Sequence, residues 1–304
     1  MRILITGVAG FIGSALARKF IDMGYSVIGL DDLSSGDKAN VPDGVDFFRM
    51  DVATNEFANW KTEVDAFFHF AGQSSGEISF DDSISDLNRN SISTLRVCDW
   101  CRTNGVEVLF FASSMSVYGD CSTAKKVFSE NDVPLPLTPY GVSKLAAENY
   151  LRILQPSQSV YILRLFNIFG YGQNMENLRQ GMVSIYLAQA CKNKKIIVKG
   201  PLNRKRDLVH VDDAVTICAL LLKRRELGIH TLNIGTGIAV SVREIIQEIS
   251  KYMGPLEIEV IGGTRGDQMI SVADNSALMK IVDHFSFRAW QDGIADFISK
   301  QRIE

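Results

Sequence analysis

A glycine-rich turn near the start of the chain limits the possible folds more than any other feature of the sequence. Residues 6–13 read Thr-Gly-Val-Ala-Gly-Phe-Ile-Gly and lie between an expected strand, Arg2–Thr6, and an expected helix, Phe11–Met23. Glycines at this spacing permit a tight turn and close approach of a pyrophosphate, while the start of the helix offers free N–H groups to phosphates. The residues that we expect to line this phosphate site are Gly7, Gly10, Phe11, Ile12 and Gly13.

An acidic residue after the next expected strand completes this pattern. Asp31 directly follows the strand Ser26–Leu30. A carboxylate there accepts hydrogen bonds from the hydroxyls of an adenosine ribose and repels a 2′-phosphate. The alternative is a solvated aspartate at a strand end, but the preceding glycine turn favours dinucleotide binding. Because no arginine follows Asp31 immediately, we predict NAD rather than NADP as the cofactor.

Short β-rich runs alternate with amphipathic stretches through the first half of the chain. This alternation predicts an α/β fold, a Rossmann-type doubly wound parallel sheet with a smaller C-terminal α/β substrate lobe. The further strands expected in the sheet are Asp46–Arg49, Ala66–Phe70, Val108–Ala112 and Tyr161–Leu165. The further helices expected there are Ile84–Arg102 and Tyr140–Ile153, with Pro139 at a tolerated position beside the helix start.

The regular alternation of β-rich runs and amphipathic stretches ends after about residue 166. We predict a cofactor-binding domain over residues 1–166, which also takes segments near 205–237, and a smaller substrate-binding lobe over 167–304. A capping box of Ser241 and Glu244 is expected to begin the helix Val242–Tyr252. The other expected segments are helix Val183–Cys191, strand Ile196–Lys199, helix Asp212–Leu222 and strand Thr231–Ile234.

Three polar residues form the candidate catalytic group. Ser114 follows a strand, and ligand sites lie at strand ends in open α/β sheets. Tyr140 and Lys144 are four residues apart on an expected helix, so their side chains share one face. A tyrosine with an ordinary pKa near 10 is a poor base at neutral pH. A lysine ammonium and a nicotinamide cation nearby would favour the phenolate, while Ser114 is placed to hydrogen-bond the reacting oxygen.

Taken together, these motifs resemble the extended short-chain dehydrogenase/reductase family. Within it the chain is similar to the NAD-dependent nucleotide-sugar epimerases and dehydratases, of which UDP-galactose 4-epimerase is the best-known relative. The resemblance covers nearly the whole chain and implies NAD as cofactor and a nucleotide-diphosphate sugar as substrate. The cofactor residues that it implies are Asp51, Val52, Ala71, Gln73 and Asn90, besides Tyr140 and Lys144. The ligands that it implies for the nucleotide diphosphate are Asn167 and Arg206.

Departures from the family pattern narrow the reaction. In the 4,6-dehydratases an Asp-Glu pair follows the catalytic Ser or Thr, and the sugar-acid decarboxylases have Glu at the second of these positions. Here Met115 and Ser116 occupy the two positions, so both activities are disfavoured. The family usually has a phosphate-binding Arg separated by one residue from a Gly-Asp pair. Arg265 directly precedes Gly266 in this chain, which weakens its assignment as a substrate ligand.

Ser271 bears on the choice of sugar. It aligns with a position where some hexose epimerases have a bulky tyrosine that closes the sugar pocket. A small residue there leaves room for a 2-acetamido group, so we expect N-acetylhexosamine nucleotides to be accepted. The alternative is that Ser271 is an ordinary strand residue.

The resemblance and these departures predict an enzyme that epimerises a UDP-hexose or UDP-N-acetylhexosamine at C4 through a 4-keto intermediate. The same residues would serve a nucleotide-sugar 4-dehydrogenase or a 4-keto-sugar reductase, so these remain alternatives. A non-catalytic dinucleotide-binding protein is a third possibility. Proteins of that kind usually lose the Tyr or the Lys, whereas this chain keeps Tyr140 and Lys144.

Charge and hydropathy exclude other classes of partner. The formal net charge is -3, so nucleic acid is not an expected partner. No apolar run approaches the roughly 18 residues of a membrane helix, so we expect no membrane partner. The first 13 residues superficially resemble a signal peptide, but the glycine spacing argues for a retained strand and turn. We therefore expect a cytoplasmic protein.

Cysteines and histidines are expected to be structural. The five cysteines are scattered and odd in number, which is typical of reduced thiols. Cys98 and Cys101 have the CxxC spacing but lie in a helical pattern, so packing is the preferred interpretation. His69 and His210 lie in apolar contexts, and we expect no metal site. The resemblance also implies a homodimer through the helices at Ile84–Arg102 and Tyr140–Ile153.

Overall fold

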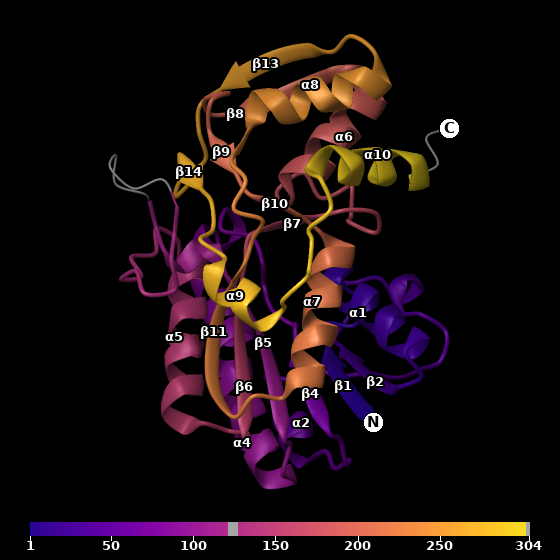
Figure 1. The fold of residues 1–304 in the computed structure, drawn as a ribbon, viewed down its shortest axis with the longest axis vertical. Coiled ribbons are helices and arrows are strands. Elements are labelled where there is room, and N and C mark those ends of the chain that lie inside the picture. The colour runs from indigo at the N-terminus through magenta and orange to yellow at the C-terminus, as the bar shows by residue number, and fades with distance from the viewer. Residues whose placement is uncertain (121–126, 302–304) are drawn as a thin grey trace.

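The computed structural model describes residues 1–120 and 127–301 of the chain. Their main feature is a sheet of seven parallel strands in the order β11-β6-β5-β4-β1-β2-β3 (Figure 1). The order changes direction between β1 and β4, and the carboxyl ends of strands at such a point form a ligand crevice. This confirms the predicted Rossmann-type sheet. Its strands are β1 (Arg2–Thr6), β2 (Ser26–Asp31), β3 (Val45–Arg49), β4 (Ala66–His69), β5 (Val108–Ser114), β6 (Ser159–Leu165) and β11 (Gly228–Ile234).

Helices cover both faces of this sheet. Successive side chains of a strand point to opposite faces, so Ile3 and Ile5 of β1 lie in one core and Leu4 lies in the other. The first core is closed by α1 (Phe11–Asp22), α7 (Val211–Arg224) and α9 (Ser276–Ile281). The second is closed by α2 (Asn55–Asn59), α4 (Ser93–Asn104) and α5 (Pro139–Leu154).

The long helix predicted at Ile84–Arg102 is interrupted. Its place is taken by α3 (Ser83–Leu87), a π-helical turn η3 (Asn88–Ile92) and α4. Ser93 Oγ donates to the carbonyl of Arg89 at 2.6 Å, and Thr94 Oγ1 donates to that of Asn90 at 2.6 Å. A π turn adds one residue without ending the helical path, so the sequence was read as one continuous helix. π turns frequently occur at functional sites.

Much of the second half forms a smaller lobe beyond the carboxyl ends of the large sheet (Figure 1). Its apolar core is built mainly from the helices α6 and α8, with Ile294 and Phe297 of α10. The helices are α6 (Met182–Asn193), α8 (Val242–Met253) and α10 (Trp290–Lys300). The small sheets pair β7 (Asn167–Phe169) with β10 (Leu208–His210), β8 (Lys195–Lys199) with β13 (Glu257–Ile261), and β9 (Lys205–Arg206) with β12 (Val240–Ser241) and β14 (Ile270–Ser271).

The predicted capping box begins α8 as expected. Ser241 Oγ accepts from the backbone N–H of Glu244 at 3.2 Å, and the Glu244 carboxylate accepts from the backbone N–H of Ser241 at 2.8 Å. Both α7 and β11 pack with the large sheet. The domain boundary at residue 166 stays a prediction. The short turns are η1 (Lys38–Asn40), η2 (Ile78–Phe80) and η4 (Met115–Val117). None of the helices in the described residues combines the length and apolar character that crossing a membrane requires.

Candidate active site

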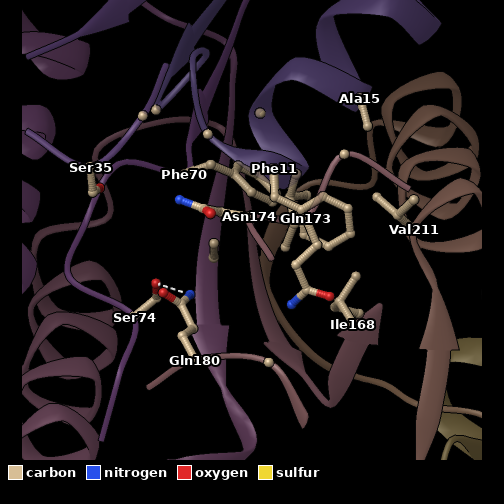
Figure 2. A pocket seen from close by; sticks show the side chains of 18 of the residues that line it. Phe11, Ala15, Ser35, Phe70, Ser74, Ile168, Gln173, Asn174, Gln180 and Val211 are labelled. Carbon is tan, nitrogen blue, oxygen red and sulfur yellow. Dashed lines mark hydrogen bonds between the residues drawn. The ribbon is translucent and has the colours of Figure 1, made fainter. Parts of the chain in front are cut away.

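A cleft of about 1180 Å³ opens between the large sheet and the smaller lobe. Figure 2 shows part of it, with Phe11 and Phe70 from the large domain near Ile168 and Gln173 from the second half of the chain. The predicted site residues that line this cleft are Gly7, Gly10, Phe11, Ile12, Gly13, Asp31, Asp51, Val52, Ala71, Gln73, Ser114, Tyr140, Lys144 and Asn167. Residues from distant parts of the chain therefore meet at one site.

The glycine turn fits a dinucleotide. Gly7 has a φ of 73°, and a Cβ there would lie 2.8 Å from the backbone nitrogen of Ala71. A Cβ on Gly13 would overlap the Gly7 carbonyl, so neither position has room for a side chain. No side chain caps the start of α1 at Gly10. The first turn of α1 therefore presents backbone N–H groups to an anion in the cleft.

Asp31 lies at the end of β2, on the cleft wall. Its carboxylate accepts from the backbone N–H of Ala9 at 3.0 Å and from that of Leu33 at 2.8 Å. Burial raises its pKa, although these two hydrogen bonds act in the opposite direction. A carboxylate oriented in this way can accept further hydrogen bonds from ribose hydroxyls.

One basic residue at this end of the cleft, Arg89, was not predicted from the sequence. Nη1 of Arg89 donates to Ser34 Oγ at 2.6 Å and lies 3.4 Å from the carboxylate of Asp32. Arg89 comes from the π-helical turn, 57 residues after Asp32 in the sequence. No local motif could have placed it here, because the contact depends on how that turn sits against β2.

The candidate catalytic residues meet where β5 ends and α5 begins. Thr138 caps α5 by accepting from the backbone N–H of Gly141 at 3.0 Å, and Pro139 occupies the first turn. This fixes Tyr140 near Ser114, to which its hydroxyl is hydrogen-bonded. Lys144 lies one turn later on the same face of α5.

Burial controls the protonation of this group. It raises the pKa of Tyr140 to about 12, although the hydrogen bond with Ser114 acts against that rise. It lowers the pKa of Lys144 to about 8, opposed by the carboxylates of Asp86 and Glu148. The side chains alone therefore do not favour the phenolate, which is expected only with a nicotinamide cation nearby. A further positive charge, such as that of a nicotinamide, is needed beside Tyr140 to favour its anion.

Met115 and Ser116 line the cleft beside Ser114. Ser114 Oγ is 3.2 Å from Ser116 Oγ, and the backbone N–H of Ser116 donates to Ser114 Oγ at 3.2 Å. The two positions after Ser114 thus carry a thioether and a hydroxyl, where the resemblance described above would place carboxyl groups in a dehydratase. Neither group performs general acid/base chemistry at neutral pH.

Three predicted substrate residues lie away from the described cleft wall. Arg206 is buried on β9, and its Nη2 donates to Asp267 Oδ1 at 2.5 Å. Burial, together with the nearby Arg204, lowers the pKa of Arg206 to about 10. Arg265 stacks over the ring of Phe80, with 4.2 Å between Cζ and the ring centroid. Their assignment as diphosphate ligands stays a prediction.

Ser271 is also buried, on β14, away from the cleft surface. Its hydroxyl lies 2.9 Å from Sδ of Met115, and Met115 itself lines the cleft. Any room that Ser271 provides for a sugar substituent therefore depends on where the Met115 side chain lies.

Asn90 and Gln73 meet at a buried carboxylate. Nδ2 of Asn90 and Nε2 of Gln73 each donate to Oδ1 of Asp86 at 3.0 Å. Oδ1 of Asn90 is buried with no hydrogen-bond partner in the described part of the chain. A Cβ on Gly72 would come within 3.3 Å of the Lys144 ammonium nitrogen, so Gly72 keeps this side of Lys144 open.

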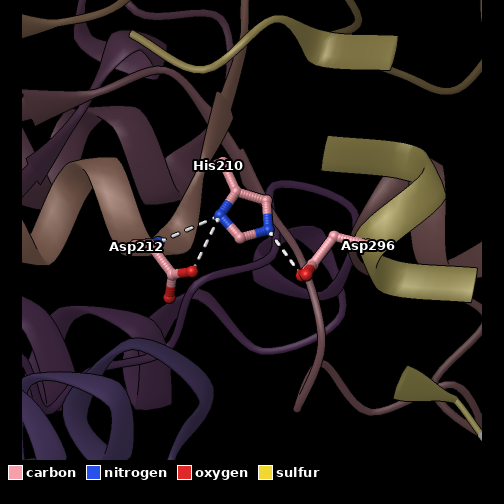
Figure 3. Close-up of side chains that lie close together, drawn as sticks. All are labelled: His210, Asp212 and Asp296. Carbon is pink, nitrogen blue, oxygen red and sulfur yellow. Dashed lines mark hydrogen bonds and ion pairs between the residues drawn. The ribbon is translucent and has the colours of Figure 1, made fainter. Parts of the chain in front are cut away.

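The two histidines have structural partners. Nδ1 of His69 is 2.8 Å from Thr6 Oγ1, and burial lowers the pKa of His69 to about 3. Figure 3 shows His210 between Asp212 of α7 and Asp296 of α10, at 3.5 Å and 3.4 Å.

Both carboxylates beside His210 also have cationic partners. Arg288 Nη2 lies 3.3 Å from Asp212, and Lys300 Nζ lies 3.0 Å from Asp296. A network of this kind ties α10 to the start of α7 and already balances the carboxylate charges. Ligand atoms of His210, Asp212 and Asp296 lie within 4.8 Å of one another, so the expected absence of a metal site stays a prediction.

Cysteines in the described residues are free thiols. Cys98 and Cys101 lie on α4 and are buried in the core that this helix covers. Burial raises the pKa of Cys98 to about 12. The packing interpretation of the CxxC spacing is therefore confirmed. Cys121, the fifth cysteine of the sequence, lies outside the described residues.

Comparison with known proteins agrees with this geometry. The model of the NAD dependent epimerase/dehydratase family matches residues 3–235. The chain belongs to this family. NAD is accordingly its cofactor, in agreement with the glycine turn and Asp31.

Several relatives match over most of their length. The chain is 32% identical to a UDP-glucose 4-epimerase of Mycolicibacterium smegmatis, over 97% of this chain and 96% of that protein. It is 32% identical to a putative UDP-glucose 4-epimerase of Methanocaldococcus jannaschii, over 83% of this chain and 82% of that protein. The solved structure of the Thermus thermophilus UDP-glucose 4-epimerase with NAD is 30% identical, covers 98% of both chains and has a TM-score of 0.88.

Proposed function

We propose that this protein epimerises a nucleotide-activated hexose at C4 through a 4-keto intermediate. The observation that carries the proposal is the meeting of Ser114, Tyr140 and Lys144 at the cleft that contains the glycine turn, with Met115 and Ser116 in place of acid/base residues. The similarity to enzymes called UDP-glucose 4-epimerases supports it further.

The residues divide the chemistry between them. Tyr140, as phenolate, takes the proton of the C4 hydroxyl and later returns one to the reduced sugar. Ser114 hydrogen-bonds the same oxygen, and Lys144 supplies positive charge that stabilises the phenolate. NAD, which the glycine turn and Asp31 would hold in the cleft, would supply the hydride acceptor and donor that the side chains lack. The overall reaction is redox-neutral, so no cofactor exchange is needed.

Contacts around the cleft favour an epimerase over a dehydrogenase, which must exchange its cofactor at each turnover. Gln180 Nε2 donates to Ser74 Oγ at 2.6 Å, and both residues line the cleft (Figure 2). Beside them Ser75 Oγ donates to the Arg179 carbonyl at 2.9 Å, and Arg179 Nη2 pairs with Asp81 at 2.6 Å. We call these three contacts the clasp. By joining two segments beside the cleft, the clasp would retain a bound dinucleotide.

We propose that Asn167 and Arg206 bind the diphosphate, with the nucleotide extending into the smaller lobe. Asn167 lines the cleft, and its Nδ2 donates to the Asp207 carbonyl at 3.1 Å. Arg206 directly precedes Asp207 in the sequence. The two candidate ligands, Asn167 and Arg206, therefore lie near each other. A forked guanidinium suits phosphate oxygens, and Asp267 holds that group until the substrate enters.

We also propose that the chain forms a homodimer through α3 and α5. Apolar side chains stand out to solvent on both helices. They are Ile84 and Leu87 of α3, and Val142, Tyr150 and Ile153 of α5. A second copy of this surface would cover them.

The test uses purified protein without added cofactor. It is incubated with UDP-glucose, UDP-N-acetylglucosamine and their GDP and dTDP counterparts, and the products are followed by NMR. Formation of a C4 epimer without external NAD supports the proposal, and faster conversion of the N-acetyl sugar supports the Ser271 hypothesis. No epimer, together with an absorbance change at 340 nm once NAD(H) and a hydroxy- or keto-sugar are supplied, indicates the dehydrogenase or reductase instead.

A further inference from the structure

Asp86 is a buried carboxylate close to the candidate catalytic group. It lies on α3 and is fully buried. Its oxygens accept three hydrogen bonds, from Ser143 Oγ at 2.6 Å, Asn90 Nδ2 at 3.0 Å and Gln73 Nε2 at 3.0 Å. All three donors are neutral, so they stabilise the carboxylate without cancelling its charge.

Lys144 is also removed from water. Its ammonium donates to the Ala112 carbonyl at 2.9 Å and lies 4.9 Å from the centre of the Phe111 ring. The ionisable groups that act on it are His69 of β4, Asp86 of α3, and Tyr140 and Glu148 of α5. His69 stays neutral because burial keeps its pKa near 3.

Glu148 is already neutralised by other residues. Its carboxylate accepts from Arg164 Nη2 at 2.7 Å and Nε at 3.0 Å, and from Arg152 Nη2 at 2.8 Å. The positive charges of these two guanidinium groups offset the negative charge of Glu148, so Glu148 stabilises the Lys144 ammonium less than an unpaired carboxylate would. Asp86 has only neutral donors, and two of them place it beside Lys144. Ser143 directly precedes Lys144 on α5, and Asn90 Oδ1 and Lys144 Nζ border the same point, 2.5 Å and 3.3 Å from a Cβ built on Gly72. The charge of Asp86 therefore remains available to Lys144.

We propose that Asp86 is a positioning residue that keeps Lys144 protonated beside Tyr140. Without a nearby anion, burial would drive Lys144 to its neutral form, and a neutral amine cannot stabilise the Tyr140 phenolate. The negative charge of Asp86 itself raises the pKa of Tyr140 and so disfavours the phenolate. Asp86 can therefore favour the phenolate only indirectly, by keeping Lys144 protonated. The proposal rests on the proposed function for the role of Lys144, but the charge balance itself holds for any reaction.

A purely structural role would give a different result. Asp86 also connects Gln73, Asn90 and Ser143, and an amide at this position would keep the size of the side chain. Asp86→Asn therefore removes the charge and retains the shape. Asp82→Asn is the matched control, because Asp82 is an exposed carboxylate that caps the same helix and Asn is an equally good cap.

The experiment follows the protonation of Lys144 directly. Full-length protein labelled with ¹⁵N-lysine is titrated without substrate, and the side-chain signal of Lys144 is assigned by its absence in Lys144→Met. We expect a midpoint of about 8 in the unaltered protein. In Asp86→Asn the midpoint should fall by about one pH unit or more, a roughly tenfold loss of proton affinity. Asp82→Asn should leave it unchanged, and an unchanged midpoint in Asp86→Asn would overturn the proposal.

A second measurement covers the case in which Asp86→Asn does not fold. The carboxyl carbons of ¹³C-aspartate-labelled protein are titrated, and Asp86 is assigned by the shift that Ser143→Ala causes. Asp86 must be ionised at pH 7 for the proposal to hold, whereas a carboxyl still protonated there contradicts it. Both titrations are independent of turnover, so absence of epimerase activity would refute the proposed function and leave this result intact.

Discussion

Nη2 of Arg206 lies 2.5 Å from Oδ1 of Asp267, and only 3% of the Arg206 side chain is exposed. Asp267 also pairs with Arg204, so one carboxylate holds two guanidinium groups in the smaller lobe. A nucleotide diphosphate would replace one anion with another at this place. The pair therefore keeps a buried cation satisfied, and under the proposed function the diphosphate of the substrate would take over that role.

Arg206→Lys should raise KM for the nucleotide sugar by roughly tenfold or more with little change in kcat, because lysine lacks the fork that binds two phosphate oxygens. Steady-state kinetics measures both constants. Arg243→Lys, on the exposed side of α8, is the control and should behave like the unaltered protein. An unchanged KM in Arg206→Lys would remove Arg206 from the diphosphate site.

Gln180→Ala should release NAD faster, by about tenfold, because it breaks the bond to Ser74 that forms part of the clasp. The measurement is the amount of NAD that remains with the protein during extended dialysis, determined after denaturation. Gln247→Ala changes an exposed glutamine of α8 and should retain as much NAD as the unaltered protein. Equal retention in both variants would argue against a holding role for the clasp.

His69 should make the protein sensitive to acid. Its pKa is about 3 in the fold and 6.5 when unfolded, so the unfolded state binds the extra proton between these values. Stability is therefore lost as the pH falls below 6.5, by up to about 1.4 kcal/mol for each pH unit.

Urea unfolding at pH 7.5 and pH 5.5 measures this loss. His69→Gln should show a smaller difference between the two pH values than the unaltered protein. His284→Gln, at an exposed position, should not reduce it. If His69→Gln loses as much stability in acid as the unaltered protein, His69 is not the group responsible.

Ile153→Glu should convert the expected dimer to a monomer, because it places a charge on the apolar surface of α5. Ile153 is 79% exposed, and the control Leu227→Glu changes a side chain that is 74% exposed elsewhere. Sedimentation velocity distinguishes the two masses. A monomeric unaltered protein, or a dimer that survives Ile153→Glu, would contradict this interface.

Local spacing was enough to predict the parts of the site that lie close together in the sequence. The glycine turn needs only residues 6–13, and four-residue spacing on a helix places Tyr140 and Lys144 on one face. The same applies to the capping box at Ser241. In these cases the physical cause of the structure is contained within one or two turns of chain.

Contacts between distant segments could not be predicted in this way. Gln180 and Ser74 are 106 residues apart, and Arg206 and Asp267 are 61 apart. The first pair depends on how the two lobes pack, and the second on how β9 pairs with β14 within the smaller lobe. No local pattern encodes either arrangement. Asp86 was missed because an acid in an amphipathic helix usually faces solvent, and only the packing of α3 on α5 buries it.

Under the proposed function, the clasp would have a consequence for regulation. An epimerase that keeps one dinucleotide through every turnover does not respond to the ratio of oxidised to reduced NAD in its surroundings. Its weakness is different: each keto-sugar that escapes before hydride returns leaves a reduced cofactor behind and an inactive protein. The number of turnovers before inactivation would then depend on how rarely the keto-sugar intermediate escapes, and not on the supply of cofactor.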